Sequence, residues 1–488
     1  MYIQVMKTAK KQEHSLESGS PGAPTRNGTK RLIVLAVILF WLTGTFQNYV
    51  GISSIITLFD EPLNATNGSQ IMAPRKTFQA DPFFKEIYEE IDDRAQDKER
   101  CEKYGFTLER TQDQPRRRVF LASLIASESK QLFQIHAGEN YNLYHSVSFV
   151  ESNTTFIGTP RTIEMTRGDE KYDMVMSGLF GNETIVDINY WNVEDPKLKF
   201  MEREYVQRGS LTESWERLGM QPDDIGIISD IDEVFSRDFL RALQVCNVPE
   251  FNPSNDSDVL YSCQKPKIFP STAVYEGFPD CRRKEGWYHP DLMIGHCIQG
   301  IGDPTDRVAP VRTYKRLEGR RRRGFGRMGP KDFNYDMTRY PLWGAQDFRD
   351  TVGSRKQYQF SKDKKNRPTD PTMGPLGIAY HFHNWFDGSL KTTLRQKYVS
   401  YGHANKRFGT VPLSNISKAT DLTVRCVKNI SVADAKVDQT VMQVALKFDE
   451  IGNEFNPIFF RNATYREERR KEVARMIAED EAIYGSLY

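Results

Sequence analysis

The sequence has almost no net charge and no internal repeat. Its 67 Lys and Arg residues nearly balance its 65 Asp and Glu residues, which leaves a formal charge of +2 over 488 residues. A nucleic-acid-binding protein carries a strongly basic domain, so this composition argues against that class. With 39% hydrophobic residues, the chain can bury one large core or two modest ones.

Charged side chains are missing altogether from one long segment, Leu32 to Phe59. It contains the apolar run LIVLAVILFWL and is long enough to span a bilayer, which takes about 20 residues. Lys and Arg precede it, whereas Asp60 and Glu61 follow it, so the positive-inside rule places the N-terminus in the cytoplasm. A cleaved signal peptide is the alternative, but no A-x-A-like site follows. We expect a retained anchor, type II topology and a lumenal remainder.

Cysteine is scarce and is absent before this segment. The six cysteines all follow the segment, and none has the paired spacing of a zinc site. We expect them to staple the fold through up to three disulfides. Chance predicts roughly three Asn-x-Ser/Thr glycosylation acceptors, yet nine occur. Eight follow the predicted anchor: Asn64, Asn67, Asn153, Asn182, Asn255, Asn415, Asn429 and Asn462. This excess supports exposure to the secretory pathway.

The composition and the periodicity divide the chain into five parts. We expect a cytoplasmic tail (1–31), the anchor (32–59), a polar lumenal stem (60–115), a catalytic domain (116–410) and a C-terminal helical extension (411–488). Strand-like runs at 119–125, 147–150, 185–188 and 225–229 alternate with helix-like segments, which predicts an α/β sheet. In the extension, 463–484 has a helical stripe of Val473, Met476, Ile477 and Ile483.

The stretch IISDIDEVFSRDFL (227–240) ends a short apolar run on three acids. The chain has a second Asp-x-Asp triplet, Asp256 and Asp258, so spacing alone carries little information. Its setting does. A Ser210 capping box predicts a helix before the run, and Ser236 is predicted to cap a helix after it. The acids therefore follow a strand in an α–β–α sequence, the position at which open α/β sheets bind ligands.

Three roles fit acids in this place. Two carboxylates can hold Mg²⁺ or Mn²⁺ on the diphosphate of a nucleotide-sugar. In haloacid-dehalogenase-like phosphatases the first Asp, here Asp230, is instead the nucleophile. The third role is structural, since acids near a helix N-terminus stabilise that helix. A lumenal glycan-binding protein without activity is a further alternative.

Three ordered segments resemble glycosyltransferase family 17. They are VESNTTFIGTPR (150–161), REYVQR (203–208) leading through a helix to IISDIDEV, and IAYHFHNWF (378–386) followed by KYVSYGHANK (397–406). The chain has Tyr380-His381-Phe382-His383 where the family has Trp-His-Cys-Ser, and Phe235 where it has Pro.

The resemblance implies a GT-A-like, Rossmann-type nucleotide-sugar-binding sheet and a Golgi membrane enzyme. Such an enzyme transfers N-acetylglucosamine (GlcNAc) with inversion from UDP-GlcNAc to a β-linked mannose of an N-glycan core on a glycoprotein, as in addition of the bisecting residue. The implied cofactor is a divalent cation, Mn²⁺ or Mg²⁺.

The resemblance also suggests roles for individual residues. Asp230 and Asp232 carry over as the metal and nucleotide-sugar pair, with Glu233 orienting them or binding the donor sugar. His381 is a candidate third metal ligand, with a core histidine as the alternative, and His403 is a weaker candidate. Glu151 faces the nucleotide-sugar or the metal, or is a structural loop acid.

An inverting transfer also needs a general base for the acceptor hydroxyl. No motif identifies it. Asp347 and Asp291 are our candidates, because both lie among aromatic residues, a setting that binds a sugar ring and raises the pKa of a carboxylate.

Overall fold

The computed structural model describes residues 82–191, 200–248, 251, 268, 272–283, 287, 289–298, 300–301, 378–385, 394–400, 405–428 and 458–486. The chain divides into two units, Met1–Ala73 and Pro74–Tyr488, and every described residue belongs to the second. Within these ranges, no helix combines the length and the apolar character needed to cross a bilayer. The predicted anchor (32–59) lies outside the described residues.

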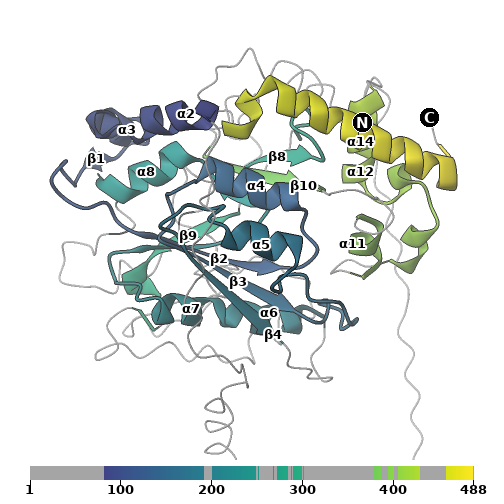
Figure 1. The fold of residues 1–488 in the computed structure, drawn as a ribbon, viewed down its shortest axis with the longest axis horizontal. Coiled ribbons are helices and arrows are strands. Elements are labelled where there is room, and N and C mark those ends of the chain that lie inside the picture. Colours follow the sequence, from purple (N-terminus) through teal and green to yellow (C-terminus); the bar gives the residue numbers. More distant parts are fainter. Residues whose placement is uncertain are drawn as a thin grey trace, which may run out of the picture. The chain divides into compact units, whose positions relative to one another are not determined.

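A five-stranded sheet forms the centre of the fold (Figure 1). In chain order its strands are β2 (Val119–Ile125), β3 (Ser146–Ser152), β4 (Ile185–Trp191), β5 (Ile225–Ile228) and β9 (Asp291–Ile294). The spatial order is β4-β3-β2-β5-β9; the first four strands are parallel and β9 is antiparallel to β5. The four predicted strand runs are confirmed as β2 to β5.

Helices cover both faces of this sheet, which explains why every residue of β2, β3 and β5 is buried. Figure 1 shows α4 (Lys130–Glu139) and α5 (Glu170–Met176) on one side, and α6 (Phe200–Gly209) and α7 (Leu211–Arg217) on the other. Trp215 of α7 packs so closely on β5 that a Cβ at Gly226 would lie 2.6 Å from its ring. Glycine at this position therefore permits the contact.

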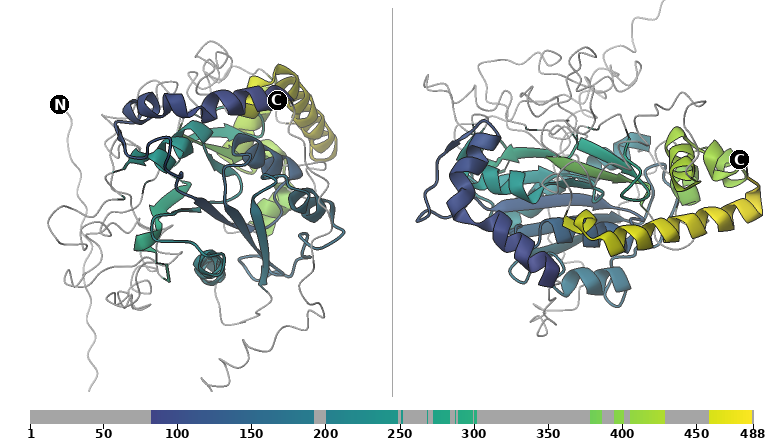
Figure 2. Two further views of the ribbon diagram at one scale, coloured as in Figure 1. Left: turned by 60° about the vertical axis from the view of Figure 1, so that its left-hand side comes forward. Right: turned by 90° about the horizontal axis from the view of Figure 1, so that it is seen from above.

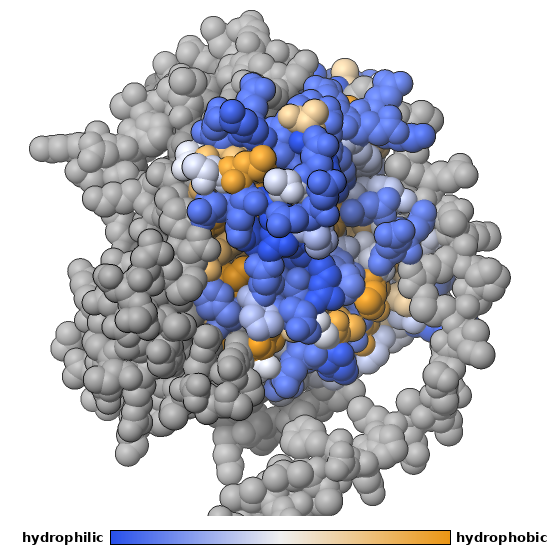
Figure 3. Space-filling model, turned by 90° about the vertical axis from the view of Figure 1, so that its left-hand side faces the viewer, coloured by the Kyte–Doolittle hydropathy of each residue, from blue (hydrophilic) through white to orange (hydrophobic). Residues whose placement is uncertain are grey.

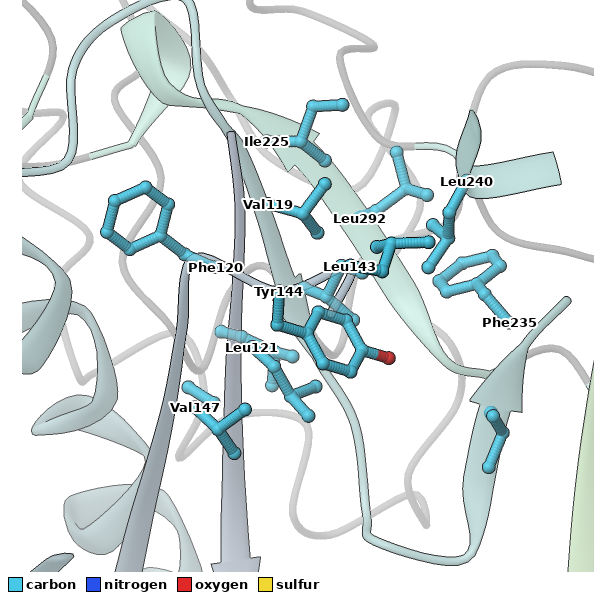
Figure 4. Packing of buried hydrophobic residues seen from close by; sticks show 14 of the residues in the cluster. Val119, Phe120, Leu121, Leu143, Tyr144, Val147, Ile225, Phe235, Leu240 and Leu292 are labelled. Atoms are coloured by element: carbon cyan, nitrogen blue, oxygen red, sulfur yellow. The ribbon is translucent and has the colours of Figure 1, made fainter. Parts of the chain in front are cut away.

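The largest hydrophobic core lies between the sheet and the segments packed on it. Figure 4 shows Val119 and Leu121 of β2, Ile225 of β5 and Leu292 of β9 in one cluster with Leu240, which comes from α8 (Arg237–Val245). All of these side chains are at most 1% exposed. Burial of an aliphatic side chain contributes about 1.5–3 kcal/mol, so this packing fixes the sheet beneath the acidic segment.

A second sheet has three strands in the order β6-β10-β8. They are β6 (Glu233–Phe235), β8 (Thr272–Glu276) and β10 (Ala379–His383). β10 is antiparallel to β6 and parallel to β8. Aromatic residues of β8 and β10 line one face and contact Phe460. His381 is paired with Glu233, and His383 with Glu276, on the other, polar face.

Residues from the end of the predicted stem pack on α8. They form α2 (Pro82–Asp92), α3 (Asp97–Lys103) and β1 (Thr107–Leu108), which pairs with β7 (Cys246–Asn247). A disulfide joins Cys101 to Cys246, and Asp92 accepts hydrogen bonds from Arg237 and Arg241 of α8. The view in Figure 3 shows a mainly hydrophilic face where described residues reach the surface.

The C-terminal part contains α11 (Leu394–Ser400), α12 (Lys418–Lys428) and α14 (Ala463–Tyr484). Figure 2 shows α14 with α12 beside it. The predicted stripe is confirmed for Val473, Met476 and Ile477, which are at most 3% exposed, but it is wrong for Ile483. That side chain is 52% exposed, whereas Asp480 and Tyr484 on either side of it contact Arg395 of α11.

Short 3₁₀ helices connect these elements: η1 (Arg94–Gln96), η3 (Gly295–Cys297), η7 (Lys406–Gly409), η8 (Leu413–Asn415) and η10 (Ile458–Arg461). A second disulfide joins Cys281 to Cys426. Cys297 is also disulfide-bonded, and no described cysteine is free. The prediction that cysteines staple the fold is confirmed for this part of the chain.

Candidate functional site

The acidic segment 229–232 connects β5 to β6 and thus joins the two sheets. Main-chain contacts hold it from both sides. His136 Nδ1 of α4 donates to the carbonyl of Ile231 at 3.0 Å, and the amide of Phe382 on β10 donates to the carbonyl of Asp232 at 2.7 Å. The segment is therefore a rigid connection at the carboxyl end of β5.

Glu233 reinforces this connection. Its Oε2 accepts from the amide of Asp230 at 3.0 Å, while the amide of Glu233 donates back to the carbonyl of Asp230 at 2.9 Å. Its Oε1 accepts from the indole Nε1 of Trp287 at 2.7 Å. The first of the two roles predicted for Glu233, orientation of the aspartates, agrees with these contacts.

Asp230 is held by a buried arginine. Arg208, near the end of α6, donates from Nη2 to Asp230 Oδ1 at 2.9 Å and to Glu204 Oε1 at 2.8 Å. The Arg208 side chain is 4% exposed, whereas that of Asp230 is 39% exposed. The arginine thus fixes one carboxylate oxygen from beneath while the carboxylate itself reaches the surface.

Asp232 is paired with His381 of β10, with 3.4 Å between Oδ2 and Nε2. Burial acts to raise the pKa of Asp232, but the imidazole beside it outweighs that effect and the pKa lies below its ordinary value. For His381, burial acts to lower the pKa, and the Asp232 carboxylate raises it above its ordinary value. The structure therefore brings together two of the three predicted metal ligands.

An aromatic residue and a second acid–histidine pair lie beside this group. The Trp287 ring is 5.4 Å from the His381 ring and 5.5 Å from the His289 ring, between centroids. His289 Nδ1 is 2.5 Å from Oδ2 of the buried Asp291. Asp291 pairs with Ile228, the last residue of β5, so this predicted base lies at the same edge of the sheet as the acidic segment. The other predicted base, Asp347, and His403 lie outside the described residues.

Glu151 is engaged by its own loop. It is fully buried near the end of β3. Oε1 accepts from Arg161 Nη2 at 2.8 Å and from the amide of Glu164 at 2.9 Å, and Oε2 accepts from the amide of Met165 at 2.8 Å. Burial raises the pKa of Glu151 although these contacts oppose the change. Of the two roles that the sequence left open, the contacts favour the structural loop acid.

The predicted helix caps are wrong in detail. Both helices form, but neither Ser210 nor Ser236 accepts a capping hydrogen bond through its side chain. Ser210 Oγ donates to the carbonyl of Gln207 instead. At α8, the first amide, that of Arg237, donates to the buried Glu139 carboxylate of α4 at 3.0 Å. A tertiary partner therefore satisfies the first amide of α8 and ties α8 to α4.

The donor set of Asp230, Asp232 and His381 has the chemistry that Mn²⁺ accepts, two carboxylates and an imidazole. In the part of the chain that the structure describes, no group of three or more His, Cys, Asp or Glu side chains is arranged to hold a metal ion. His381 Nδ1 is buried there without a hydrogen-bond partner. The residue types fit a divalent cation, and Asp232 and His381 are the two that already lie side by side.

Sequence reasoning missed several residues of this site. Arg208 lies in the quoted segment REYVQR, and Trp287 and His289 lie beside Asp291 in WYHPD, so both segments carried a signal. Glu128, in the loop after β2, gave no signal; burial raises its pKa to about 7, with the Asp232 charge contributing to the rise. Glu276 and His383 form a further pair on the polar face of the second sheet, 2.9 Å apart.

Residues 46–264 match the sequence model of glycosyltransferase family 17. Over these residues the chain belongs to glycosyltransferase family 17. The match includes Glu151, Arg208 and the acidic segment, which confirms the resemblance seen in the sequence. No curated protein matches the chain. Trp287, His289 and His381 lie beyond the matched residues, so the match does not bear on them.

Proposed function

We propose that this family 17 enzyme transfers GlcNAc from UDP-GlcNAc to a β-linked mannose of an N-glycan core, with inversion and with a divalent cation. Family membership supports transfer of a sugar from a donor to an acceptor. The observation that carries the finer proposal is the fixed acidic segment: Asp230 and Asp232 lie at the carboxyl end of β5, each with a partner from another element.

The position of these acids supports a GT-A-like site. In open α/β sheets, ligands bind outside the carboxyl ends of the parallel strands. Asp230 and Asp232, with His381, would hold the cation there, and Mn²⁺ is our choice over Mg²⁺ because imidazole is among the donors. A bound cation would offset the charge that grows on the departing diphosphate.

The chain's own residues have positioning roles in this proposal. Arg208 and Glu233 hold the acidic segment in one conformation, so the carboxylates need not reorganise when the donor binds. The Trp287 ring lies beside this segment and is suited to pack against a sugar ring. The polar face of the second sheet then forms one wall of the site.

We also propose a type II Golgi membrane protein with the catalytic domain in the lumen. The charge-free segment 32–59 and the excess of glycosylation acceptors support this assignment. Asn182 and Asn415 are exposed acceptors in the described part of the chain, whereas the side chain of Asn462 accepts from the amide of Tyr465 at the start of α14. Lumenal exposure predicts glycans on Asn182 and Asn415, which peptide mass spectrometry after glycosidase treatment can detect.

The function is tested by incubating the purified full chain with Mn²⁺, UDP-GlcNAc and a panel of N-glycan cores. Mass spectrometry should show one added GlcNAc, and linkage analysis should place it on the β-linked mannose. Cleavage of an aryl phosphate without use of any UDP-sugar would favour the phosphatase alternative. Absence of both activities, with no thermal stabilisation by UDP and Mn²⁺, would favour an inactive glycan-binding protein.

A further inference from the structure

The pair formed by His289 and Asp291 has the geometry of an oriented imidazole. Asp291 Oδ2 lies 2.5 Å from His289 Nδ1, and the Asp291 side chain is fully buried while that of His289 is 15% exposed. A carboxylate can only accept this hydrogen bond, so Nδ1 donates and the lone pair of the neutral ring is on Nε2. The pair therefore presents a proton acceptor on the ring nitrogen remote from Asp291.

The backbone around His289 is fixed in the same way. Thr272 Oγ1 of β8 donates to the carbonyl of His289 at 2.6 Å, and two residues later β9 begins with Asp291. The imidazole is thus held between the two sheets. The ring of Trp287 contacts the His289 imidazole, and its indole nitrogen donates a hydrogen bond to Glu233 next to the acidic segment.

We propose that His289 is the general base of the transfer and that Asp291 is its positioning residue; this inference rests on the proposed function. Nε2 of His289 takes the proton of the acceptor hydroxyl as that oxygen bonds to the anomeric carbon of the donor sugar. The bond from this carbon to the diphosphate oxygen breaks, and the nucleoside diphosphate leaves with the electron pair. Asp291 stabilises the imidazolium that forms.

Other groups at this edge are less suited to the role. Asp291 is too buried to reach an acceptor hydroxyl itself. Asp230 is engaged by Arg208, and Glu233 holds both Trp287 and the amide of Asp230.

The second acid–histidine pair, Glu276 and His383, is a weaker candidate for an electrostatic reason. Glu276 also accepts from Arg283 Nη1 at 3.3 Å and from Asn384 Nδ2 at 3.2 Å. A guanidinium therefore already offsets the charge of Glu276, which leaves less stabilisation for an imidazolium at His383.

The test compares His289→Ala with wild type in the full chain, using UDP-GlcNAc and the N-glycan core that wild type accepts. A general base contributes about 100- to 10,000-fold, so kcat for transfer should fall within that range while the KM for UDP-GlcNAc stays unchanged. Added imidazole should restore part of the transfer. Asp291→Asn should lower kcat without changing the donor KM, and imidazole should not restore it. His145→Ala is the matched control, because His145 directly precedes β3, at the opposite edge of the sheet.

Three results would overturn the inference. The first is a near-normal kcat in His289→Ala. The second is loss of the thermal shift with UDP and Mn²⁺ in both His289→Ala and Asp291→Asn. The third is a loss of transfer that added imidazole restores in His383→Ala but not in His289→Ala. Should wild type itself neither transfer GlcNAc nor release UDP, the proposed function fails instead. Slow release of UDP to water without acceptor needs no base for a sugar hydroxyl and should persist in His289→Ala, which separates the two cases.

Discussion

The carboxylate of Asp232 lies 3.4 Å from the imidazole of His381, although the first belongs to the connection after β5 and the second to β10 of the other sheet. The pair joins the two sheets at the acidic segment. Their mutual charge lowers the pKa of Asp232 and raises that of His381, each against the effect of burial.

Asp232→Asn should abolish transfer and preserve the fold. The amide keeps the shape of the carboxylate but loses the charge needed to hold a cation, so we expect a loss of about 100- to 1,000-fold in kcat. Circular dichroism should be unchanged, and the thermal shift with UDP and Mn²⁺ should disappear. EDTA should have the same effect on wild type. Asp113→Asn, at an exposed position, is the control; normal transfer by Asp232→Asn, or in EDTA, would disprove metal dependence.

Arg208→Lys should lower transfer by about 10- to 100-fold without unfolding the enzyme. Lysine keeps the positive charge but lacks the planar guanidinium group. Arg208 uses that group to donate from Nη2 to both Glu204 and Asp230. The expected defect is weaker Mn²⁺ binding, measured as a higher Mn²⁺ concentration at half-maximal rate. Arg217→Lys, on the exposed side of α7, serves as the comparison, and equal rates for both variants would contradict the role given to Arg208.

Glu151→Gln should reduce stability more than it reduces donor affinity. The substitution weakens a buried ion pair with Arg161 and replaces a carboxylate that accepts hydrogen bonds from two backbone amides. We expect it to lower the free energy of unfolding by about 3 kcal/mol. Thermal unfolding should show a lowered midpoint, while the KM for UDP-GlcNAc measured below that midpoint should stay near wild type. Glu164→Gln, at a more exposed side chain, should change neither. A raised donor KM with normal stability would restore Glu151 to the donor site.

Because of Asp92, the free energy of unfolding should depend on pH in the acid range. Burial acts to raise its pKa, but Arg241 and Arg237 outweigh burial and hold the pKa well below the ordinary Asp value of about 3.9. A lowered folded-state pKa stabilises the fold above about pH 4, and this stabilisation is lost as the pH falls further. Asp92→Asn should therefore cost about 2–3 kcal/mol near neutral pH and progressively less below about pH 4. Urea unfolding across this pH range measures the difference, and a constant difference would refute it.

The parallel strands β2, β3 and β5 were predictable because each is buried on both faces and so has a short apolar run between polar segments. The acids at the end of β5 were predictable for the same reason. The family resemblance named His381 as their neighbour, but Trp287 was not predicted. Both residues come from distant segments that reach Asp232 and Glu233 only after the second sheet forms, and strand register, not local sequence, decides which residues meet.

The helix cap predicted at Ser236 and the two roles left open for Glu151 depend on partners from elsewhere in the fold. Ser236 has the local signature of a helix cap, but its side chain makes no capping bond, and the carboxylate of Glu139 accepts from the first amide of α8 from another helix. Glu151 has the strand-end position of a ligand-binding acid, yet its charge is used by Arg161 and the loop amides. In both cases a buried polar group had to find a partner, and the partner was supplied by tertiary structure.

The attachment of α2 and α3 to α8 limits where the chain can be cut without loss of contacts to α8. A protease that cut after Lys103 would separate nothing, because the Cys101–Cys246 bond would still hold the two pieces together. A cut after Asp92, by contrast, would leave the buried guanidinium groups of Arg237 and Arg241 without this carboxylate. A fragment that keeps this contact must therefore begin at or before Asp92.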